Sequence, residues 1–95
     1  KMVALTKSRR LMCWNAAERK EEEDFNSVLE TCITKYYVST VSNEVASLAV
    51  QIFGANGCKN GYAIERYFRD AKISEIIEGS SQILEIMIAS NYLEE

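Results

Sequence analysis

Two stretches of the sequence decide the fold: residues 50–57 read VQIFGANG, and residues 64–82 read IERYFRDAKISEIIEGSSQ. The first joins the apolar end of a helical run to a glycine-rich turn, where Gly54 is expected to end the helix as a left-handed C-cap residue. The second is a further helical run that ends in a Glu-Gly-Ser corner at residues 78–80. A corner of this type can direct a carboxylate out of a helix bundle toward a ligand.

Upstream of this region, the spacing of apolar residues predicts two helices. The first is expected over residues 3–20, and its basic C-terminal end suits the negative end of a helix dipole. Asp24 is a candidate N-cap for the second helix, which runs without a breaker to Gly54. A helix of nearly thirty residues would be about 43 Å long. Because its apolar stripe would otherwise face water, this helix must pack against others.

Downstream of the glycine-rich turn, the pattern predicts shorter helices. One is expected over residues 63–69, and Asp70 is expected to begin another turn. Gly79 breaks the pattern, and either Ser80 or Ser81 is expected to cap a last helix. The residues expected on buried faces are Ile73, Ile76 and Ile77 before the corner, and Ile83, Leu84, Met87, Ile88 and Leu93 after it.

No segment shows the sustained alternation of a β-strand, and the sequence contains no proline. The predicted fold class is therefore all-α, an antiparallel helical bundle over residues 1–95 that lacks at least one helix. A chain of 95 residues forms one domain at most, near the small end of what buries a core. The chain begins with Lys1 rather than methionine, which suggests a fragment or a processed product, although an expression artefact would look the same.

Composition argues against several classes of function. The net charge of -3 offers no electrostatic basis for binding nucleic acid. No run approaches the roughly 18 apolar residues of a membrane span, and the N-terminus shows no signal-peptide pattern. The cysteines form no CxxC pair and there is no histidine, so no metal site is expected. Free and mostly buried thiols, in a reducing cytoplasm-like compartment, are expected at Cys13, Cys32 and Cys58.

Glu78 is the first candidate for chemistry, because it lies where a helical run ends and Gly79 follows. Its carboxylate can project into a cleft, while the glycine allows a ligand to approach the backbone. From the residues alone, the favoured interpretation is that Glu78 is one more surface carboxylate among 14 acidic residues. No histidine or other evident partner supports catalysis here.

The turn that follows Gln51 is the second candidate. A glutamine amide both donates and accepts hydrogen bonds, which suits a nucleotide edge or a ribose, and N–H groups in a glycine-rich turn suit phosphate. From the residues alone, a helix C-cap with a polar neighbour is the favoured interpretation. Arg66, Arg69 and Asp70 form a charged cluster, for which local pairing at a helix junction is favoured over phosphate binding.

These stretches resemble the C-terminal domain of the acyl-CoA dehydrogenases, flavoenzymes that oxidise acyl-CoA thioesters in fatty acid metabolism. Most members carry a segment like QIFGGNGY and then PVERxxRDAKIxxIxEGTSQIQ. This chain has QIFGANGC at residues 51–58 and AIERYFRDAKISEIIEGSSQIL at residues 63–84. The resemblance covers most of the chain and implies part of a four-helix up-down bundle. It also implies that Glu78 is the catalytic base, which removes a proton next to the thioester carbonyl, with Gly79 beside the substrate.

The same resemblance implies a cofactor and partners. Family members use the glycine turn to hold FAD bound in the adjacent subunit, which implies contacts from Gln51, Gly54 and the backbone of Ala55. Ser80 and Gln82 occupy positions that imply further flavin contacts. Family members are mostly homotetramers, or dimers of dimers, so a homo-oligomer (a dimer or tetramer) is expected, with a flavoprotein as electron acceptor. The implied location is the cytoplasm, or the mitochondrial matrix in a eukaryote.

The chain departs from the family pattern at a few positions. Ala55 stands where a second glycine is usual, so a backbone that needs a positive φ would be strained there. Cys58 replaces a usual aromatic residue and Ala63 a common proline, while Ser80 keeps the hydroxyl of the usual threonine. These changes suggest a divergent member with an altered fit around FAD or substrate.

Two other functions stay open at this point. One is a non-catalytic helical bundle that keeps the fold and serves as an assembly or scaffold module. The other is a regulatory bundle that exists by itself at this length. A flavin absorption band in the natural full-length product favours the enzyme over the assembly module, whereas the regulatory bundle predicts a native transcript that encodes only this length.

Overall fold

A computed structural model describes residues 1–23 and 26–93, and within these ranges every regular element is helical. The all-α fold class predicted from the sequence is confirmed. Asp24, the expected N-cap of the second helix, lies outside the described residues. The elements are α1 (Met2–Glu21), α2 (Ser27–Phe53), the short 3₁₀ helix η1 (Gly54–Cys58), α3 (Ala63–Ser74) and α4 (Ser81–Leu93).

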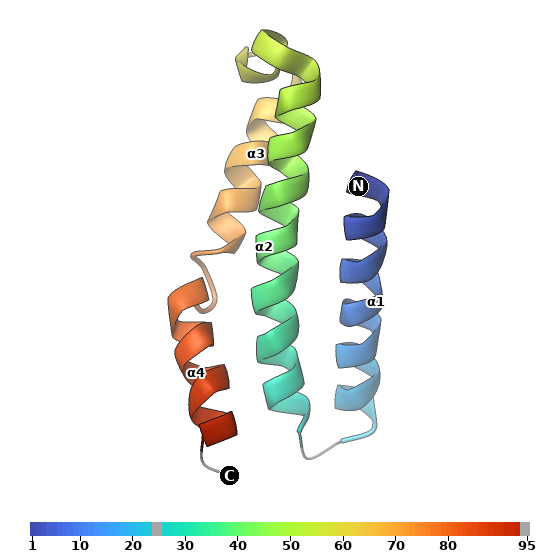
Figure 1. Cartoon of the computed structure of the whole chain (residues 1–95), viewed down its shortest axis with the longest axis vertical. Coiled ribbons are helices and arrows are strands. Elements are labelled where there is room, and N and C mark those ends of the chain that lie inside the picture. Colours follow the sequence, from blue (N-terminus) through green and yellow to red (C-terminus); the bar gives the residue numbers. More distant parts are fainter. Residues whose placement is uncertain (24–25, 94–95) are drawn as a thin grey trace.

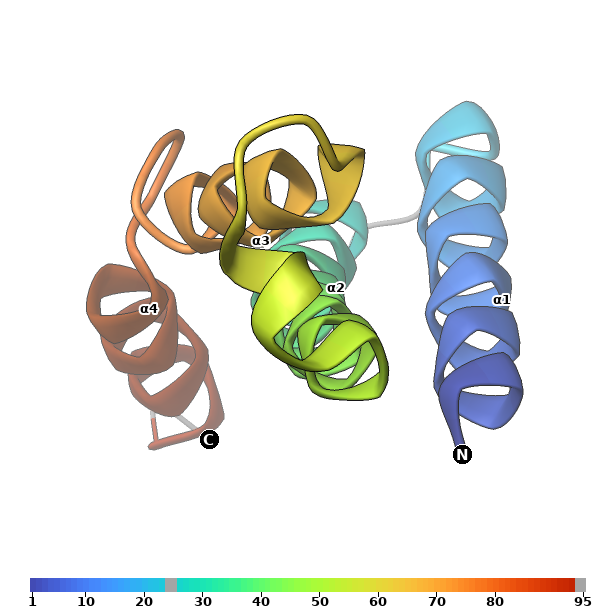
Figure 2. The same ribbon diagram turned by 90° about the horizontal axis from the view of Figure 1, so that it is seen from above.

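The long helix α2 is the centre of the bundle. Helix α1 packs along one side of it, and α3 and α4 follow one another along the other side (Figure 1). Both α1 and the pair α3 and α4 run antiparallel to α2. The view from above shows α1 and α4 on opposite sides of α2 (Figure 2). The result is an elongated antiparallel bundle with extents of 49 × 23 × 19 Å.

The third helix is longer than the sequence pattern predicts. It continues to Ser74 instead of ending at Arg69, and no glycine or proline interrupts it. Arg69 donates to Glu65 one turn earlier, from Nε to Oε2 at 3.0 Å and from Nη2 to Oε1 at 3.2 Å. A pair at this spacing stabilises a helix by about 0.2–0.5 kcal/mol. Arg69 therefore pairs locally, as expected, but inside a continuous helix rather than at a junction.

The buried core of the described residues is small, because α1, α3 and α4 each pack against α2, and α1 contacts neither α3 nor α4. The apolar side chains that are buried are Ala16, Val41 and Leu84. Most of the apolar residues expected on buried faces are exposed, since no described element covers the outer side of α3 and α4. Those exposed residues are Ile73, Ile76, Ile77, Ile83, Met87 and Leu93.

The cysteines also differ in part from expectation. All three thiols are free, but Cys13 and Cys58 are exposed rather than buried, and Cys32 is half-buried. Cys13 lies on a helix that has a neighbour on one side only, so its far face meets solvent. The expectation of mostly buried thiols is therefore wrong for these residues.

Polar contacts set how α1 lies against α2. Arg9 Nη1 donates to Ser42 Oγ at 2.7 Å, and the hydroxyls of Ser8 and Tyr37 are 3.1 Å apart. These contacts join the middle of the two helices, so they resist sliding of one helix along the other. None of the helices within residues 1–23 and 26–93 is both long and apolar enough to cross a membrane. The same ranges contain no group of three or more His, Cys, Asp or Glu that could hold a metal ion.

Candidate active site

The Glu78 corner, residues 75–80, joins the end of α3 to the start of α4. The N–H of Ser81 donates to Glu75 O at 3.0 Å across this corner, so the chain folds back on itself. Glu78 has a φ of 56° and Gly79 has a φ of 101°. A left-handed conformation costs a residue with a Cβ roughly 1–2 kcal/mol. Strain of this kind persists only where the surroundings hold it, and it clusters at functional sites.

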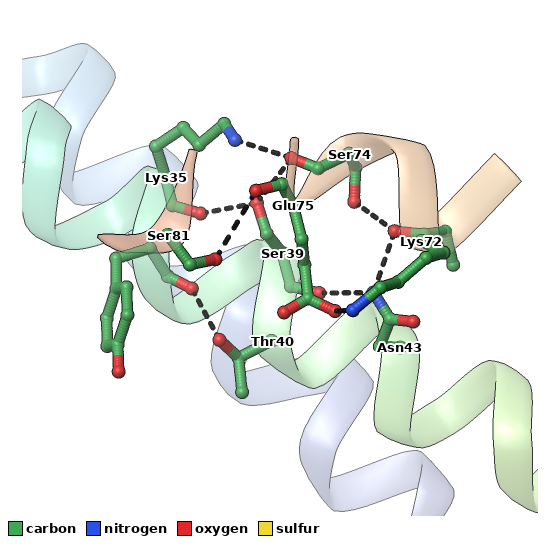
Figure 3. A network of polar contacts seen from close by, with 10 residues as sticks. Lys35, Ser39, Thr40, Asn43, Lys72, Ser74, Glu75 and Ser81 are labelled. Carbon is green, nitrogen blue, oxygen red and sulfur yellow. Dashed lines mark hydrogen bonds and ion pairs between the residues drawn. The ribbon is translucent and has the colours of Figure 1, made fainter. Parts of the chain in front are cut away.

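Three polar side chains of α2 hold the end of α3 from the side (Figure 3). Lys35, Ser39 and Asn43 follow each other at intervals of one helical turn, so they share one face of α2. Asn43 Nδ2 donates to Ala71 O at 2.8 Å, and Ser39 Oγ donates to Ser74 O at 3.1 Å. The last carbonyls of a helix have no partner within that helix. These side chains therefore satisfy the end of α3 and fix it against α2.

Lys35 extends this contact across the corner. Its Nζ donates to Ser74 O, at the last residue of α3, and to Gly79 O at 3.0 Å. The two carbonyls come before and after Glu78 in the chain. One ammonium group thus bonds to both sides of the corner.

The carboxylate of Glu78 is exposed, and it has no hydrogen bond or ion pair with any described residue. Its neighbour Glu75 differs, because that carboxylate pairs with Lys72 at 3.7 Å. An unpaired carboxylate can accept a proton, and exclusion of water strengthens it as a base. The described residues do not cover Glu78, so they do not by themselves form the dry pocket that a base requires.

Ser80 and Gln82 lie at the start of α4, directly after Glu78. The Oγ of Ser80 accepts a hydrogen bond of 3.4 Å from the N–H of Ile83, and its carbonyl accepts one of 3.0 Å from Leu84. Ser80 is therefore the N-cap of α4, one of the two residues expected in that role. A hydroxyl that accepts in this way can still donate to a ligand. Gln82 is exposed on the first turn of the helix.

The glycine turn at the end of α2 corrects the expectation of strain at Ala55. Gly54 has a φ of 64° and a ψ of -142°, so a positive φ at this C-cap is confirmed, while ψ lies outside the left-handed helical region. Ala55 has no positive φ, because η1 continues the chain in a 3₁₀ conformation. Alanine in place of the usual glycine therefore introduces no backbone strain here.

The same turn is open to a group that approaches from outside the chain. Gln51, Gly54 and Ala55 are exposed, and a Cβ on Gly54 would meet no heavy atom within 4 Å beyond its chain neighbours and the adjacent helix backbone. Gln51 borders two open grooves, one of about 400 Å³ beside η1 and α3, and one of about 410 Å³ beside α1. The side-chain amide and the exposed backbone are the kinds of group that bind ribose and phosphate. The turn therefore fits contacts to a dinucleotide.

The structure does not bring the glycine turn and the Glu78 corner together. Gln51 lies about 24 Å further along α2 than Lys35, the residue of α2 that bonds to the corner. One small ligand held by a single copy of the chain cannot contact both regions. The candidate residues thus form two clusters: Glu78, Gly79, Ser80 and Gln82 in one, and Gln51, Gly54 and Ala55 in the other.

The contribution of α2 to the corner has only a weak signature in the sequence. Lys35, Ser39 and Asn43 recur at intervals of one turn within a helix whose other faces are largely apolar. Such a stripe could have been noticed as a polar face. Its partners are backbone carbonyls, which every residue carries, so the sequence does not identify what the stripe contacts.

The family described as "Acyl-CoA dehydrogenase, C-terminal domain" has a model that matches residues 1–93 of this chain. Together with the helical bundle and the Glu-Gly-Ser corner, this match defines the class of protein. The chain belongs to the acyl-CoA dehydrogenase family, and it matches the C-terminal domain of that family.

Individual relatives agree with this assignment. The mitochondrial short-chain specific acyl-CoA dehydrogenase of Sus scrofa is 34% identical over 97% of this chain and 22% of the relative. Subunit CarC of the caffeyl-CoA reductase-Etf complex of Acetobacterium woodii is 33% identical over 97% of this chain and 24% of the relative. The chain therefore spans about a quarter of the length of these relatives.

Solved structures show the same similarity in three dimensions. Butyryl-CoA dehydrogenase from Megasphaera elsdenii superposes with a TM-score of 0.88 at 31% identity, over 95% of this chain and 23% of that one. A chain in a structure of an electron transferring flavoprotein of Acidaminococcus fermentans superposes with a TM-score of 0.91 at 35% identity. The match covers 99% of this chain and 24% of that one. The helical arrangement described above is thus that of the family.

Proposed function

We propose that this chain is part of an FAD-dependent acyl-CoA dehydrogenase, which converts an acyl-CoA thioester to the 2,3-enoyl-CoA. The observation that carries the proposal is the Glu78 corner, where Glu78 has an unpaired, exposed carboxylate and a positive φ of 56°. Family membership supports the reaction class, and relatives named for butyryl-CoA and short-chain acyl-CoA support the substrate class. Because the chain spans about a quarter of its relatives, we assign the activity to a longer polypeptide and none to residues 1–95 alone.

In this proposal Glu78 is the general base. Its carboxylate takes the proton from the carbon next to the thioester carbonyl, so that the C–H bond breaks and a carboxylic acid forms. The electrons of that bond form the carbon–carbon double bond, while a hydride leaves the neighbouring carbon. FAD, when bound, supplies the acceptor for that hydride. Gly79 has no side chain, which leaves room for the thioester beside the base.

Two groups of residues would hold the cofactor. Gln51 and the backbone of Gly54 and Ala55 are exposed at the end of α2, where an amide and N–H groups suit ribose and phosphate oxygens. Ser80 and Gln82 offer a hydroxyl and an amide next to the base. Because these two groups lie far apart in one chain, we assign the turn to the FAD of a neighbouring subunit.

The assembly and the electron acceptor are part of the same proposal. A homo-oligomer, a dimer or tetramer, would place the glycine turn of one copy against the flavin of another. A relative named as a subunit of an Etf complex, and a similar chain in a structure of an electron transferring flavoprotein, support a flavoprotein as acceptor. We place the enzyme in the cytoplasm or, in a eukaryote, in the mitochondrial matrix; the relative from Sus scrofa is named as mitochondrial.

A second candidate function is a non-catalytic assembly module derived from this fold. The observation that favours it is the exposure of both Glu78 and the apolar sides of α3 and α4. A module of this kind would bind other protein surfaces and would not need flavin. The absorption spectrum of the natural full-length product separates the two functions, because only the enzyme shows a flavin band.

The replacement of Glu78 by glutamine in the full-length parent tests the catalytic role. The substitution keeps the size of the side chain and removes the base. Since positioned general bases contribute about 10²–10⁴-fold, reduction of the flavin by acyl-CoA is expected to slow by that factor. Stopped-flow absorbance of the flavin measures the rate, and titration with acyl-CoA is expected to show largely unchanged binding.

Glu75→Gln is the matched control, because Glu75 lies in the same corner but its carboxylate pairs with Lys72. Flavin reduction in this control is expected to match the parent. If Glu78→Gln reduces its flavin as fast as the parent does, then Glu78 is not the base.

A further inference from the structure

We propose that Lys35 is a positioning residue for Glu78, an inference that rests on the proposed role of Glu78 as base. Lys35 lies on α2, far from the corner in sequence, and reaches it with its ammonium group. Nζ donates to Ser74 O and, at 3.0 Å, to Gly79 O. One cation therefore joins the two ends of the short segment that carries the base.

The electrostatics of the corner favour a cation at this place. The C-terminal end of α3 carries the negative end of its helix dipole, and its last carbonyls lack partners within the helix. Hydrogen bonds from a charged donor are about twice as strong as neutral ones. The link that Lys35 makes between Ser74 O and Gly79 O is called the Lys35 bridge. Ser39 Oγ supports this bridge, because it also donates to Ser74 O, at 3.1 Å. Among the described residues, Lys35 is the one donor to Gly79 O.

The Lys35 bridge matters because the backbone between Ser74 and Gly79 includes the strained residue Glu78. Glu78 and Gly79 both have a positive φ, of 56° and 101°. A glutamate released from its surroundings relaxes toward the extended or right-handed helical regions, which turns its carboxylate in another direction. Misplacement of a reacting group by about 1 Å can slow a reaction about 10²-fold. Lys35 therefore sets where the carboxylate of Glu78 points.

A purely structural role for Lys35 makes a different prediction. An anchor that only joins α2 to α3 would lower the melting temperature and disturb binding and rate alike. A positioning residue acts through Glu78, so its loss slows the chemical step while substrate binding is kept. The experiment therefore separates rate, binding and local backbone motion in the full-length, flavin-loaded parent.

Lys35→Met keeps the aliphatic stem and removes both hydrogen bonds. Flavin reduction at saturating acyl-CoA is expected to slow about 10–10²-fold, while the Kd for acyl-CoA changes less than about threefold. Amide hydrogen exchange at Ser81, whose N–H bonds to Glu75 O across the corner, is expected to become at least about tenfold faster. Lys35→Arg retains a cation with several donors and is expected to recover most of the rate.

Lys72→Met is the matched control. Lys72 is a nearby lysine whose exposed side chain pairs with Glu75 at 3.7 Å and donates to no carbonyl of the corner. Its rate, binding and exchange are expected to match those of the parent. A parent rate of flavin reduction in Lys35→Met overturns the proposal.

A double variant shows whether the effect passes through Glu78. In the Glu78→Gln background, the added Lys35→Met change is expected to cause no further loss of rate, because there is no base left to position. The same fold-loss in both backgrounds overturns the proposal and makes Lys35 a general structural residue. Should Lys35→Met fail to fold, Lys35→Gln replaces it, and a parent rate with this shorter, neutral side chain overturns the proposal equally.

These results are distinguishable from failure of the proposed function. A parent rate of flavin reduction in Glu78→Gln excludes Glu78 as the base, whatever rates the Lys35 variants show. A low rate in Glu78→Gln together with a parent rate in Lys35→Met supports Glu78 as the base and excludes Lys35 as its positioning residue.

Discussion

Tyr36 on α2 donates a hydrogen bond of 2.8 Å from its hydroxyl to Oε1 of Glu85 on α4. The bond ties α4 to the central helix next to the buried side chain of Leu84. By accepting this hydrogen bond, and through its negative charge, Glu85 raises the pKa of Tyr36 above its ordinary value of 10.0. Desolvation and the charge of Glu75 add to the same shift. The contact between α2 and α4 is therefore coupled to pH.

The first prediction follows from the sign of this shift. Because the pKa of Tyr36 is higher in the folded state, the stability from this bond is complete below pH 10.0 and is lost as pH rises through the folded-state pKa. Glu85→Gln removes the charge, so the pKa of Tyr36 is expected to fall toward 10.0. Ultraviolet titration of the phenolate, with Tyr36→Phe subtracted, measures it.

A control for this titration is Glu44→Gln. Glu44 pairs with Lys1 at 3.0 Å, and it is not among the groups that shift Tyr36. The titration of Tyr36 is expected to be unchanged in this variant. An unshifted Tyr36 in Glu85→Gln would contradict the assignment of the hydrogen bond.

The second prediction concerns the packing of η1 against α2. A Cβ on Gly57 would lie 2.9 Å from Val50 O and 3.1 Å from Val50 Cα. Because both atoms are backbone, they cannot move aside cheaply, and Gly57→Ala is expected to lower the free energy of unfolding by about 1–3 kcal/mol. Ala55→Ser in the same exposed turn is the control and is expected to change stability by less than about 0.5 kcal/mol. Equal chemical denaturation midpoints for the two variants would contradict the close contact.

The third prediction concerns self-association of the 95-residue chain. The outer sides of α3 and α4 expose apolar residues, and exposed patches of this kind mark interaction surfaces. Sedimentation is expected to show a mass that rises with concentration. Ile86→Lys, at a side chain that is 65% exposed, is expected to weaken association. Ser90→Lys adds the same charge at an exposed polar residue of the same helix and is expected to have a smaller effect. A monomer at every concentration would count against an apolar interface.

The fourth prediction concerns the glycine turn in the full-length parent. If this turn holds the FAD of a neighbouring subunit, cofactor retention and assembly are linked, because each bound flavin adds contacts between subunits. Gln51→Ala is expected to release FAD more readily and to loosen the oligomer on dilution, whereas Glu78→Gln is expected to do neither. Bound flavin and molar mass are measured for both variants at matched concentrations. Equal flavin occupancy in Gln51→Ala and the parent, at every dilution, removes the turn from the cofactor site.

Much of the fold could be predicted from the sequence because helix boundaries depend on neighbouring residues. The expected first helix over residues 3–20 agrees closely with α1, and the expected end of α2 at Gly54 is where it ends. The break at Gly79 and the cap at Ser80 are also confirmed. Glycine's tolerance of positive φ and the capping ability of serine act within a few residues, so both can be predicted from the local sequence.

Other features could not be predicted, because they depend on which helices lie side by side. Ile73 near the end of α3, and Ile76 and Ile77 in the Glu78 corner, have the spacing of a buried face, yet all three are exposed. Ala55 was expected to be strained, but the strain depends on the conformation of η1, which the family pattern does not specify. The assignments of Glu78 as base and of Gln51 as a flavin contact stay predictions.

By itself, the sequence determined the order of helices, their glycine breaks and the Glu-Gly-Ser corner, since each arises from local backbone preference and short-range hydrogen bonds. Only the tertiary structure decided what holds that corner. Lys35 and Gly79 are 44 positions apart, and the carbonyl that Lys35 contacts is a group that every residue carries. Their contact exists because α2 packs between α1 and the pair α3 and α4, which places the polar stripe of α2 beside the end of α3.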